Sequence, residues 1–396
     1  MTLRDLDAES LSGKRALVRV DYNVPIEDGR VGDDGRIRAT LPTLGYLRDH
    51  GARVVLLSHL GRPEGRPDPR FSLAPVAKRL EEFLGAPVVF VPSTHGDAAK
   101  AAVDALETGG VCLLENTRFH PGEEKNDAEL ARAWASLGDL YVNDAFGAAH
   151  RAHASTAAVA EYVKPAVAGF LMERELRFLG AALESPAHPF VAVLGGAKIS
   201  GKLELIDRLL GRVDKLCIGG AMACTFLHGL GFETGASLVE PELGEHAVGL
   251  MTRGGNKLIL PEDLVVAERM EAGAPKKVVR RDGIPAGWAV VDIGPGSVDR
   301  VRRELVRAKT VLWNGPVGVF EIRDFAEGTF GVARAVAEAT AMGATTILGG
   351  GDTGAAAAAA GIAEQVSHIS TGGGASLELL AGRELPGVAA LSDAGV

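Results

Sequence analysis

Along the whole chain, short apolar and β-branched runs alternate with longer segments whose apolar residues recur at helical spacing. The strand-like runs of the first half are Ala16–Asp21, Arg53–Ser58, Val88–Val91, Val111–Glu115 and Leu140–Asn143. Those of the second half are Phe190–Leu194, Lys215–Ile218, Lys257–Leu260, Ala289–Asp292, Thr310–Trp313, Thr345–Leu348 and Ser367–Ser370. Helices are predicted at Ser72–Leu84, Asp127–Ser136, Ala166–Glu184, Lys202–Leu210, Phe325–Ala339 and Ala355–Ala363.

Apolar strands that alternate with helices indicate an α/β protein whose parallel sheets are covered on both faces. A (β/α)8 barrel is the competing architecture, but the strand-like runs outnumber those of one barrel. The helical stretch Ala166–Glu184, followed by Ser185-Pro186, divides the chain near its middle. We therefore expect two doubly wound, Rossmann-like parallel-sheet domains, 1–170 and 171–385, joined by a hinge helix.

Composition narrows the class of protein. The chain has 396 residues, 46% of them hydrophobic and 23% charged, which is ordinary for a globular protein of about two or three domains. A formal charge of −9 and the lack of a basic stripe argue against nucleic-acid binding. Cys112, Cys217 and Cys224 are scattered in apolar surroundings, so buried reduced thiols are expected. With no signal pattern and no apolar run of about 18 residues, we expect a cytoplasmic protein without a membrane span.

Polar residues gather where the strands of the first half end. Ligands of open parallel sheets bind beyond the carboxyl ends of the strands. The sequences there are Asp21-Tyr22-Asn23, Ser58-His59-Leu60-Gly61-Arg62, Glu115-Asn116-Thr117-Arg118 and Asn143-Asp144, the last followed by His150-Arg151-Ala152-His153. Arg36 lies a little further on, in what we expect to be a charged loop. Arginines that converge on one rim predict a small, multiply anionic ligand.

The strand ends of the second half carry glycines instead. They read Gly195-Gly196-Ala197-Lys198, Gly219-Gly220, Asn314-Gly315-Pro316, Gly349-Gly350-Gly351-Asp352-Thr353 and Thr371-Gly372-Gly373-Gly374. Such turns before helices let the backbone approach a nucleotide and its phosphates closely. Neither a P-loop nor a GxGxxG fingerprint with its acidic partner is present. Lys198 and Lys202 have i, i+4 spacing, which places both on one face of a helix.

Asp352 suits a phosphate-bound Mg²⁺, which needs only one or two protein carboxylates. The alternative is that Asp352 and Thr353 cap the following helix, and both roles are compatible. One half suited to a small anion and the other to a nucleotide with Mg²⁺ together indicate phosphoryl transfer, which depends on positioning and charge neutralisation.

These motifs together resemble the phosphoglycerate kinase family. The matching stretches occur in family order over nearly the whole chain, and they are Arg19–Pro25, Ser58–Pro63, Leu114–Phe119, Asn143–Phe146, His150–His153, Gly195–Lys198, Trp313–Glu321, Gly349–Thr353 and Ser370–Ser376. The resemblance implies the reversible reaction of 1,3-bisphosphoglycerate with ADP to give 3-phosphoglycerate and ATP, with Mg²⁺, in glycolysis and gluconeogenesis. It also implies a hinge-bending monomer whose tail, 386–396, packs back on the N-terminal domain.

The resemblance also assigns roles to individual residues. Substrate contacts would be Asp21, Asn23, Arg36, His59, Arg62, Arg118 and Arg151. Nucleotide contacts would be Lys198, Lys202, Gly219, Gly220, Asn314, Glu321 at the ribose, Gly350, Gly351, Asp352 and Thr353, with Asp352 as the metal ligand. Arg36, Lys198 and the amides of Gly373 and Gly374 would neutralise the transferring phosphoryl group.

A few positions depart from the family pattern, and two other functions remain open. Tyr22 stands where the family often has Phe, and its hydroxyl needs a partner; Val290 replaces a common glycine and leaves the adenine contacts open. A nicotinamide-dependent dehydrogenase would require the missing GxGxxG turn. A non-catalytic nucleotide-binding scaffold would be expected to lose Arg36, Lys198 or Asp352, and all three are present.

Overall fold

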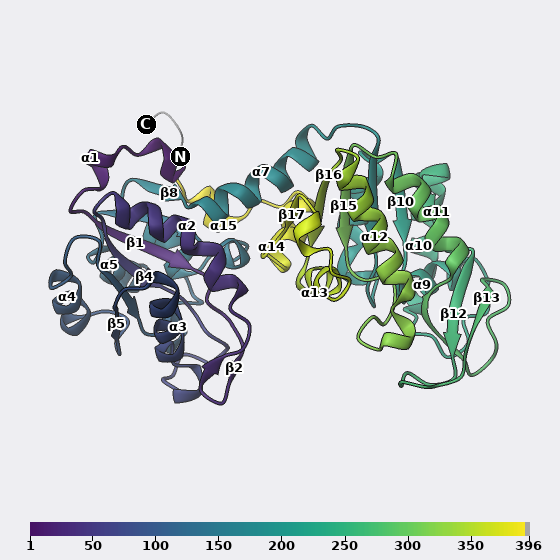
Figure 1. Ribbon diagram of the computed structural model, residues 1–396, viewed down its shortest axis with the longest axis horizontal. Coiled ribbons are helices and arrows are strands. Elements are labelled where there is room, and N and C mark those ends of the chain that lie inside the picture. The colour runs from purple at the N-terminus through teal and green to yellow at the C-terminus, as the bar shows by residue number, and fades with distance from the viewer. Residues whose placement is uncertain (393–396) are drawn as a thin grey trace. The chain divides into compact units, whose positions relative to one another are not determined.

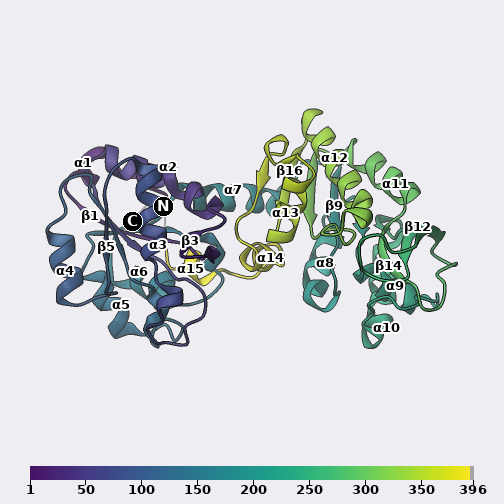
Figure 2. The same ribbon diagram turned by 60° about the horizontal axis from the view of Figure 1, so that its bottom comes forward.

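The computed structural model describes residues 1–392. The chain folds as two compact units: the first is Met1–Arg177 with the stretch that begins at Glu384, and the second is Phe178–Arg383. Each unit is an α/β domain, shown in Figures 1 and 2. Of the tail predicted at 386–396, residues 393–396 lie outside the described part of the chain.

The first unit is built on a six-stranded parallel sheet in the order β5-β6-β4-β1-β7-β8. Its strands are β1 Arg15–Val20, β4 Arg53–Leu57, β5 Val88–Val91, β6 Val111–Leu114, β7 Leu140–Asp144 and β8 Ala166–Ala168, with a small hairpin of β2 Ile26–Glu27 and β3 Arg30–Val31. Its helices are α1 Ala8–Leu11, α2 Gly35–Asp49, α3 Ala74–Leu84, α4 Asp97–Asp104, α5 Ala128–Ala135, α6 Val159–Tyr162 and α15 Pro386–Ala389.

Both faces of this first sheet are buried, which is why its strands read as continuous apolar runs. One core contains Val18 of β1 together with Leu47 of α2 and Leu80 of α3. The other contains Leu17 of β1 together with Trp134 of α5. Local signals delimit the helices: the Asp127 carboxylate accepts a hydrogen bond from the Leu130 N–H at the start of α5.

The second unit also has a six-stranded parallel sheet, in the order β11-β10-β9-β15-β16-β17. Its strands are β9 Phe190–Leu194, β10 Lys215–Ile218, β11 Leu258–Ile259, β15 Thr310–Asn314, β16 Thr345–Gly349 and β17 His368–Ile369. Its helices are α8 Leu203–Leu210, α9 Met222–Gly229, α10 Gly244–Gly254, α11 Pro295–Leu305, α12 Glu327–Ala341, α13 Gly351–Ala359 and α14 Gly374–Leu380. Figure 2 shows α11 and α12 on one side of this sheet and α8, α9 and α10 on the other.

The prediction of two parallel-sheet α/β domains is confirmed, and the barrel is excluded. Three local expectations are wrong. Ala166–Ala168 is the edge strand β8, and the helix α7 starts only at Phe170 and runs to Glu184. The run Ala289–Ile293 is a strand, β14, but it belongs to a separate antiparallel sheet with β12 Asp263–Ala267 and β13 Lys276–Arg280. Residues 198–202 form no α-helix, because Ser200–Lys202 is a 3-10 turn, so the helical spacing of the two lysines does not apply.

The C-terminal stretch lies in the first unit. The N–H of Gly387 donates to the Ala149 carbonyl at 2.9 Å, and the Gly387 carbonyl accepts from Asn143 Nδ2 at 3.0 Å. Ser392 is bonded to Ala166 and to the N-terminal amine. Cys112, Cys217 and Cys224 are free and buried, as expected. Among residues 1–392, we find no helix long and apolar enough to cross a membrane.

Candidate active site

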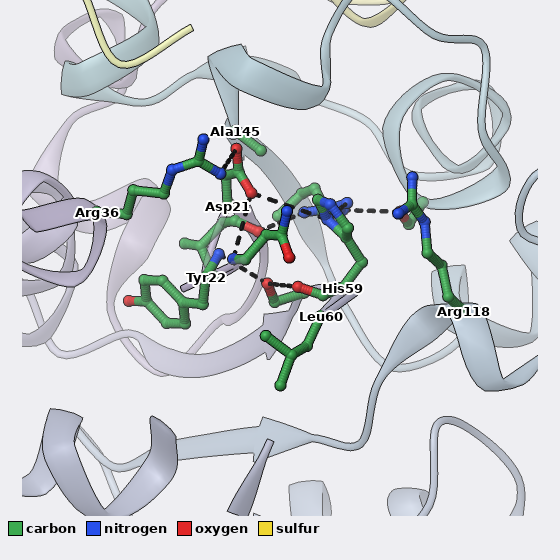
Figure 3. A network of polar contacts seen from close by, with 12 residues as sticks. Asp21, Tyr22, Arg36, His59, Leu60, Arg118 and Ala145 are labelled. Atoms are coloured by element: carbon green, nitrogen blue, oxygen red, sulfur yellow. Dashed lines mark hydrogen bonds and ion pairs between the residues drawn. The ribbon is translucent and has the colours of Figure 1, made fainter. Parts of the chain in front are cut away.

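Charged side chains meet at the carboxyl ends of β1 and β4. Asp21 directly follows β1 and is 8% exposed. Nη1 of Arg36 donates to Asp21 Oδ2 at 2.8 Å, and Nδ1 of His59 lies 3.9 Å from Asp21 Oδ1. In Figure 3, Arg36 and Arg118 lie on either side of Asp21 and His59. The prediction that Arg36 lies in a loop is wrong, because it is the second residue of α2. The helix fixes the backbone from which its side chain extends.

The turn that follows His59 joins two more of the predicted residues. The Gly61 N–H donates to Asn23 Oδ1 at 2.9 Å, and Arg118 Nη1 donates to the Gly61 carbonyl at 2.8 Å. Gly61 has a positive φ of 59°, and an added Cβ would come within 2.3 Å of the Phe71 ring. This turn therefore requires glycine, and it holds Asn23 and Arg118 on one rim.

The remaining two predicted arginines are exposed. Arg62 follows Gly61, and no ion pair holds its guanidinium within the described chain. Arg151 Nε lies 3.1 Å from His150 Nε2. Burial is the main cause of the lowered pKa of Arg118, and the positive charge of Arg151 adds to it. Arg151 is thus within electrostatic reach of the cluster, whereas Arg62 is adjacent to it only through Gly61.

The cluster has an excess of positive charge. Burial, followed by the charges of Arg19, Arg118 and Arg36, holds the pKa of His59 well below its usual value. Burial and the charge of Arg118 lower the pKa of His153 to about 3. Both imidazoles are therefore neutral donors or acceptors near neutral pH. Such a site gains most from a ligand that brings several negative charges.

In the second unit, a partly buried lysine is fixed at the ends of β9 and β15. Lys202 Nζ donates to the Gly195 carbonyl at 2.7 Å and to the Asn314 carbonyl at 3.0 Å. Burial lowers its pKa to about 8, against the opposing charge of Asp352. Asn314 is 3% exposed, and its Nδ2 donates to the Gly349 carbonyl at 2.8 Å. These hydrogen bonds connect the ends of β9, β15 and β16 next to the ammonium group of Lys202.

Glycines in this unit allow backbone to lie directly against backbone. A Cβ on Gly220, whose φ is 68°, would lie 2.6 Å from the Gly196 backbone. A Cβ on Gly219 would lie 2.6 Å from Val317 Cγ1. The Gly220 N–H donates to the Val317 carbonyl at 2.9 Å, which brings the ends of β10 and β15 together. An added Cβ would clash at both positions, so these turns require glycine.

The turn after β16 presents Asp352 on the surface. Gly350 adopts a positive φ of 93°, and Gly351 begins α13. Thr353 Oγ1 donates to the Gly349 carbonyl at 2.6 Å and accepts from the Gly315 N–H at 2.7 Å, so it does not cap the helix with its hydroxyl. The exposed carboxylate of Asp352 accepts no hydrogen bond within residues 1–392. Lys198 and Glu321 are also exposed, and the structure assigns neither a hydrogen-bonding partner within that range.

The glycine run before α14 leaves two amides unused. The Gly372 N–H donates to Ser370 Oγ at 3.1 Å, and Ser370 Oγ lies 2.5 Å from Ser376 Oγ. Gly373 has a φ of 49°, and Gly374 is the first residue of the helix. Within the described chain the N–H groups of Gly373 and Gly374 have no acceptor. They remain available to an external oxygen.

Sequence reasoning missed several buried polar residues near these sites. Arg19, Glu123 and Ser155 have no exposed surface, and they form a hydrogen-bonded chain beneath His59. Asp292 is 1% exposed, and it accepts hydrogen bonds from the Gly328 and Ile293 N–H groups. Burial raises the pKa of Asp292 to about 7. The available signals were Arg19 and Asp292, each the penultimate residue of a mostly apolar strand.

Fold and geometry together define a class: a protein of two α/β units, one with a cluster of arginines at the ends of its strands and one with glycine-rich turns there. A family model for phosphoglycerate kinase matches residues 3–383. A phosphoglycerate kinase of Chloroflexus aurantiacus is 57% identical over 99% of this chain and 99% of that protein, and one of Fervidobacterium nodosum is 53% identical over 99% and 98%.

Solved structures give the same result. The phosphoglycerate kinase of Coxiella burnetii has a TM-score of 0.89 and 41% identity, with 98% of each chain covered. That of Pyrococcus horikoshii has a TM-score of 0.85 and 32% identity, with 99% of this chain and 98% of that chain covered. The chain belongs to the phosphoglycerate kinase family. It is a phosphotransferase with a carboxyl group as acceptor, and the comparisons favour neither the dehydrogenase nor the scaffold alternative.

Proposed function

We propose that the first unit binds 3-phosphoglycerate or 1,3-bisphosphoglycerate and the second unit binds ADP or ATP with Mg²⁺. The cluster of Asp21, Arg36, His59 and Arg118 carries this proposal. Its positive charge suits a ligand with a carboxylate and a phosphate, which guanidinium groups bind in a bidentate manner. The neutral ring of His59 adds a donor, and Asp21 and Asn23 add acceptors for a hydroxyl group.

Within the first unit we assign two kinds of role. Arg118, Arg62 and Arg151 hold the phosphate end of the ligand, because they follow different strands and share one edge of the sheet. Arg36 stabilises the charge that builds up on the transferring phosphoryl group. Its partner Asp21, at 2.8 Å, orients the guanidinium before the ligand arrives.

Within the second unit the phosphates of the nucleotide lie along bare peptide. Lys202 contributes charge from a fixed position, Lys198 and the amides of Gly373 and Gly374 contact the transferring group, and Gly219 and Gly220 allow the base to approach the backbone. Glu321 accepts from the ribose hydroxyls. Asn314, Gly350, Gly351 and Thr353 shape the phosphate turn.

The residues present fit a magnesium ion held mainly by the nucleotide. Asp352 offers one exposed carboxylate free of hydrogen bonds, and residues 1–392 contain no cluster of three metal-ligating side chains. Mg²⁺ needs one or two carboxylates when phosphate oxygens complete its shell. When bound, it supplies positive charge to those oxygens. Asp352 would hold it, while Lys202 and Lys198 act on the remaining oxygens.

Transfer needs an in-line approach of a terminal β-phosphate oxygen of ADP to the phosphorus of the acyl phosphate. The bond from phosphorus to the acyl oxygen breaks as the bond to the β-phosphate oxygen of ADP forms. We propose that hinge bending brings the two ligands together and excludes water from the phosphoryl group. By the family resemblance, we propose that the protein acts as a cytoplasmic monomer; light scattering of the purified protein tests the monomeric state.

A coupled assay tests the reaction. Purified protein should form ATP from 1,3-bisphosphoglycerate and ADP, and only with Mg²⁺. Calorimetry separates the two units: Arg118→Ala should abolish binding of 3-phosphoglycerate and leave ADP binding intact, while Asp352→Asn should weaken only MgADP. Arg53→Ala is the matched control, because Arg53 lies on the same sheet and its side chain bonds only to the Gly13 carbonyl. A folded protein with no turnover would contradict the proposal.

A further inference from the structure

A chain of buried polar side chains lies beneath His59. Arg19, the penultimate residue of β1, has no exposed surface. Its Nη2 lies 3.0 Å from Nδ1 of His59, its Nε donates to Ser155 Oγ at 2.7 Å, and its Nη1 donates to the Val20 carbonyl. Ser155 Oγ in turn donates to Glu123 Oε1 at 2.5 Å. All four side chains come from different segments of the first unit.

The contact between Arg19 and His59 has only one possible direction. A guanidinium group carries five N–H donors and no acceptor. Nδ1 of His59 is therefore the acceptor, and the single proton of the neutral ring is on Nε2. The competing partner of Nδ1 is Asp21 Oδ1, but a distance of 3.9 Å is too long for a hydrogen bond.

The surroundings keep the ring neutral. Arg19 from β1, Arg118 after β6 and Arg36 from α2 all act on it with positive charge, and His153 adds to them. Asp21 is the acidic group that faces it. Burial and this excess of positive charge oppose protonation. His59 therefore offers a donor without bringing a charge of its own.

Glu123 provides the negative charge that offsets the cost of burying the Arg19 guanidinium. Its Oε1 accepts from Ser155 Oγ, and its Oε2 accepts from the Ser155 N–H at 2.9 Å. The hydroxyl of Ser155 thus links a carboxylate and a guanidinium that are both fully buried. A buried charge needs such a partner, since an unpaired one is strongly destabilising. The pair also fixes where the guanidinium points.

We propose that Arg19 is a positioning residue that holds His59 in the neutral tautomer with its proton on Nε2, so that this N–H donates to an oxygen of the anionic ligand. The inference rests on the proposed function for the identity of that ligand, a phosphoglycerate. The tautomer itself is a property of the free protein. It can therefore be measured without any turnover.

Nitrogen NMR of the free protein with ¹⁵N-labelled histidine is the first test. His59→Gln identifies the His59 signals by their loss. We expect Nδ1 of His59 to show the shift of an unprotonated nitrogen and Nε2 that of a protonated one, unchanged between about pH 5.5 and 8. A proton on Nδ1, or a ring that titrates in this range, would overturn the proposal.

Variants of Arg19 are the second test. In Arg19→Met we expect mixed tautomers or a titrating ring, and a rise of about tenfold in KM for 3-phosphoglycerate with KM for ATP unchanged. Since Arg19→Met leaves Glu123 without its counter-charge, Ser155→Ala is the milder second variant and should shift the same signals less. Arg15→Met is the matched control, because Arg15 on the same strand pairs with Asp139 at the surface.

A double variant separates positioning from a purely structural role. In His59→Gln the side-chain amide reproduces the Nε2 donor and no longer depends on a tautomer. Adding Arg19→Met to His59→Gln should therefore raise KM for 3-phosphoglycerate much less than Arg19→Met does alone. Equal increases in both backgrounds would overturn the proposal. Loss of turnover with the Nε2 proton in place would instead contradict the proposed function.

Discussion

The two units share an architecture but present different chemistry at the same edge of their sheets. In the first, the strand ends carry the polar side chains of Asp21, His59 and Arg118; Asp21 and His59 lie 3.9 Å apart, and Arg118 donates to the turn at Gly61. In the second, the strand ends carry glycines, and the contacts run from peptide to peptide, as between Gly220 and Val317. We propose that the same fold thus serves two kinds of recognition, one by charged side chains and one by close approach of the backbone.

This difference determines how each site can fail. A side-chain site loses function when a charge is removed, because each guanidinium acts on its own part of the ligand. A backbone site loses function when an atom is added, because a Cβ enters space that peptide already fills. The variants below use the two kinds of failure to test whether the contrast holds.

Removal of Arg36 should have the largest effect. Arg36→Ala should lower kcat by roughly 10²- to 10³-fold, because the charge would be missing where the transferring group develops its own. KM for ADP should change little, since we propose that the nucleotide binds to the other unit. Steady-state kinetics in both directions measure this, with Arg36→Lys as the charge-preserving control. If only the affinity for ADP fell, the role of Arg36 would be wrong.

An added methyl group in the second unit should have the next largest effect. Gly220→Ala places a Cβ 2.6 Å from the Gly196 backbone at a φ of 68°, so the turn must shift. We expect KM for ADP to rise by about 30-fold, which corresponds to roughly 2 kcal/mol of strain. Gly231→Ala is the matched control, since its φ of 82° is also positive but nothing lies within 4 Å of the added Cβ. If both variants raised KM for ADP equally, close packing of the backbone at Gly220 would not be the cause.

The effect of pH on nucleotide binding should be smaller than the effect of Gly220→Ala. Burial lowers the pKa of Lys202 to about 8, so its charge is present at pH 7 and lost as the pH rises through that value. The affinity for ADP should therefore fall by about tenfold between pH 7 and pH 9. Lys202→Arg keeps its charge over this range and should remove most of the dependence. Calorimetry at several pH values measures it; a flat profile in the parent protein would contradict the prediction.

The strand ends were readable in sequence because both units follow one rule: parallel strands deliver their following residues to one edge of a sheet. Arg36 was misplaced because the buried face of α2 includes Thr40 and Thr43 and the helix contains Pro42, which together blur its apolar period. The buried role of Arg19 could not be predicted. Its partners Ser155 and Glu123 are far away in the sequence, and only the folded first unit brings them to it.

The antiparallel sheet of β12, β13 and β14 was missed for a related reason. Strand β13 is mostly exposed and rich in lysine and arginine, so it lacks the apolar run that identifies the strands of the parallel sheets. Strand β14 is fully buried, and its run predicted a strand without revealing its partners. Strand pairing depends on which segments meet in the fold, and the apolar pattern of one segment does not contain that information.

The smallest expected effect concerns Tyr22, where the family often has Phe. Its hydroxyl lies 2.8 Å from Thr40 Oγ1, and Thr40 also donates to the Ile37 carbonyl at 2.9 Å. Tyr22→Phe removes the bond between the end of β1 and α2, the helix that carries Arg36. We expect a loss of about 1 kcal/mol, seen as hydrogen exchange about fivefold faster for amides of the first unit and unchanged for those of the second. Because Thr40 keeps its bond to Ile37, KM for 3-phosphoglycerate should hardly change. If KM for 3-phosphoglycerate also rose about fivefold, α2 would need the Tyr22 hydroxyl to place Arg36.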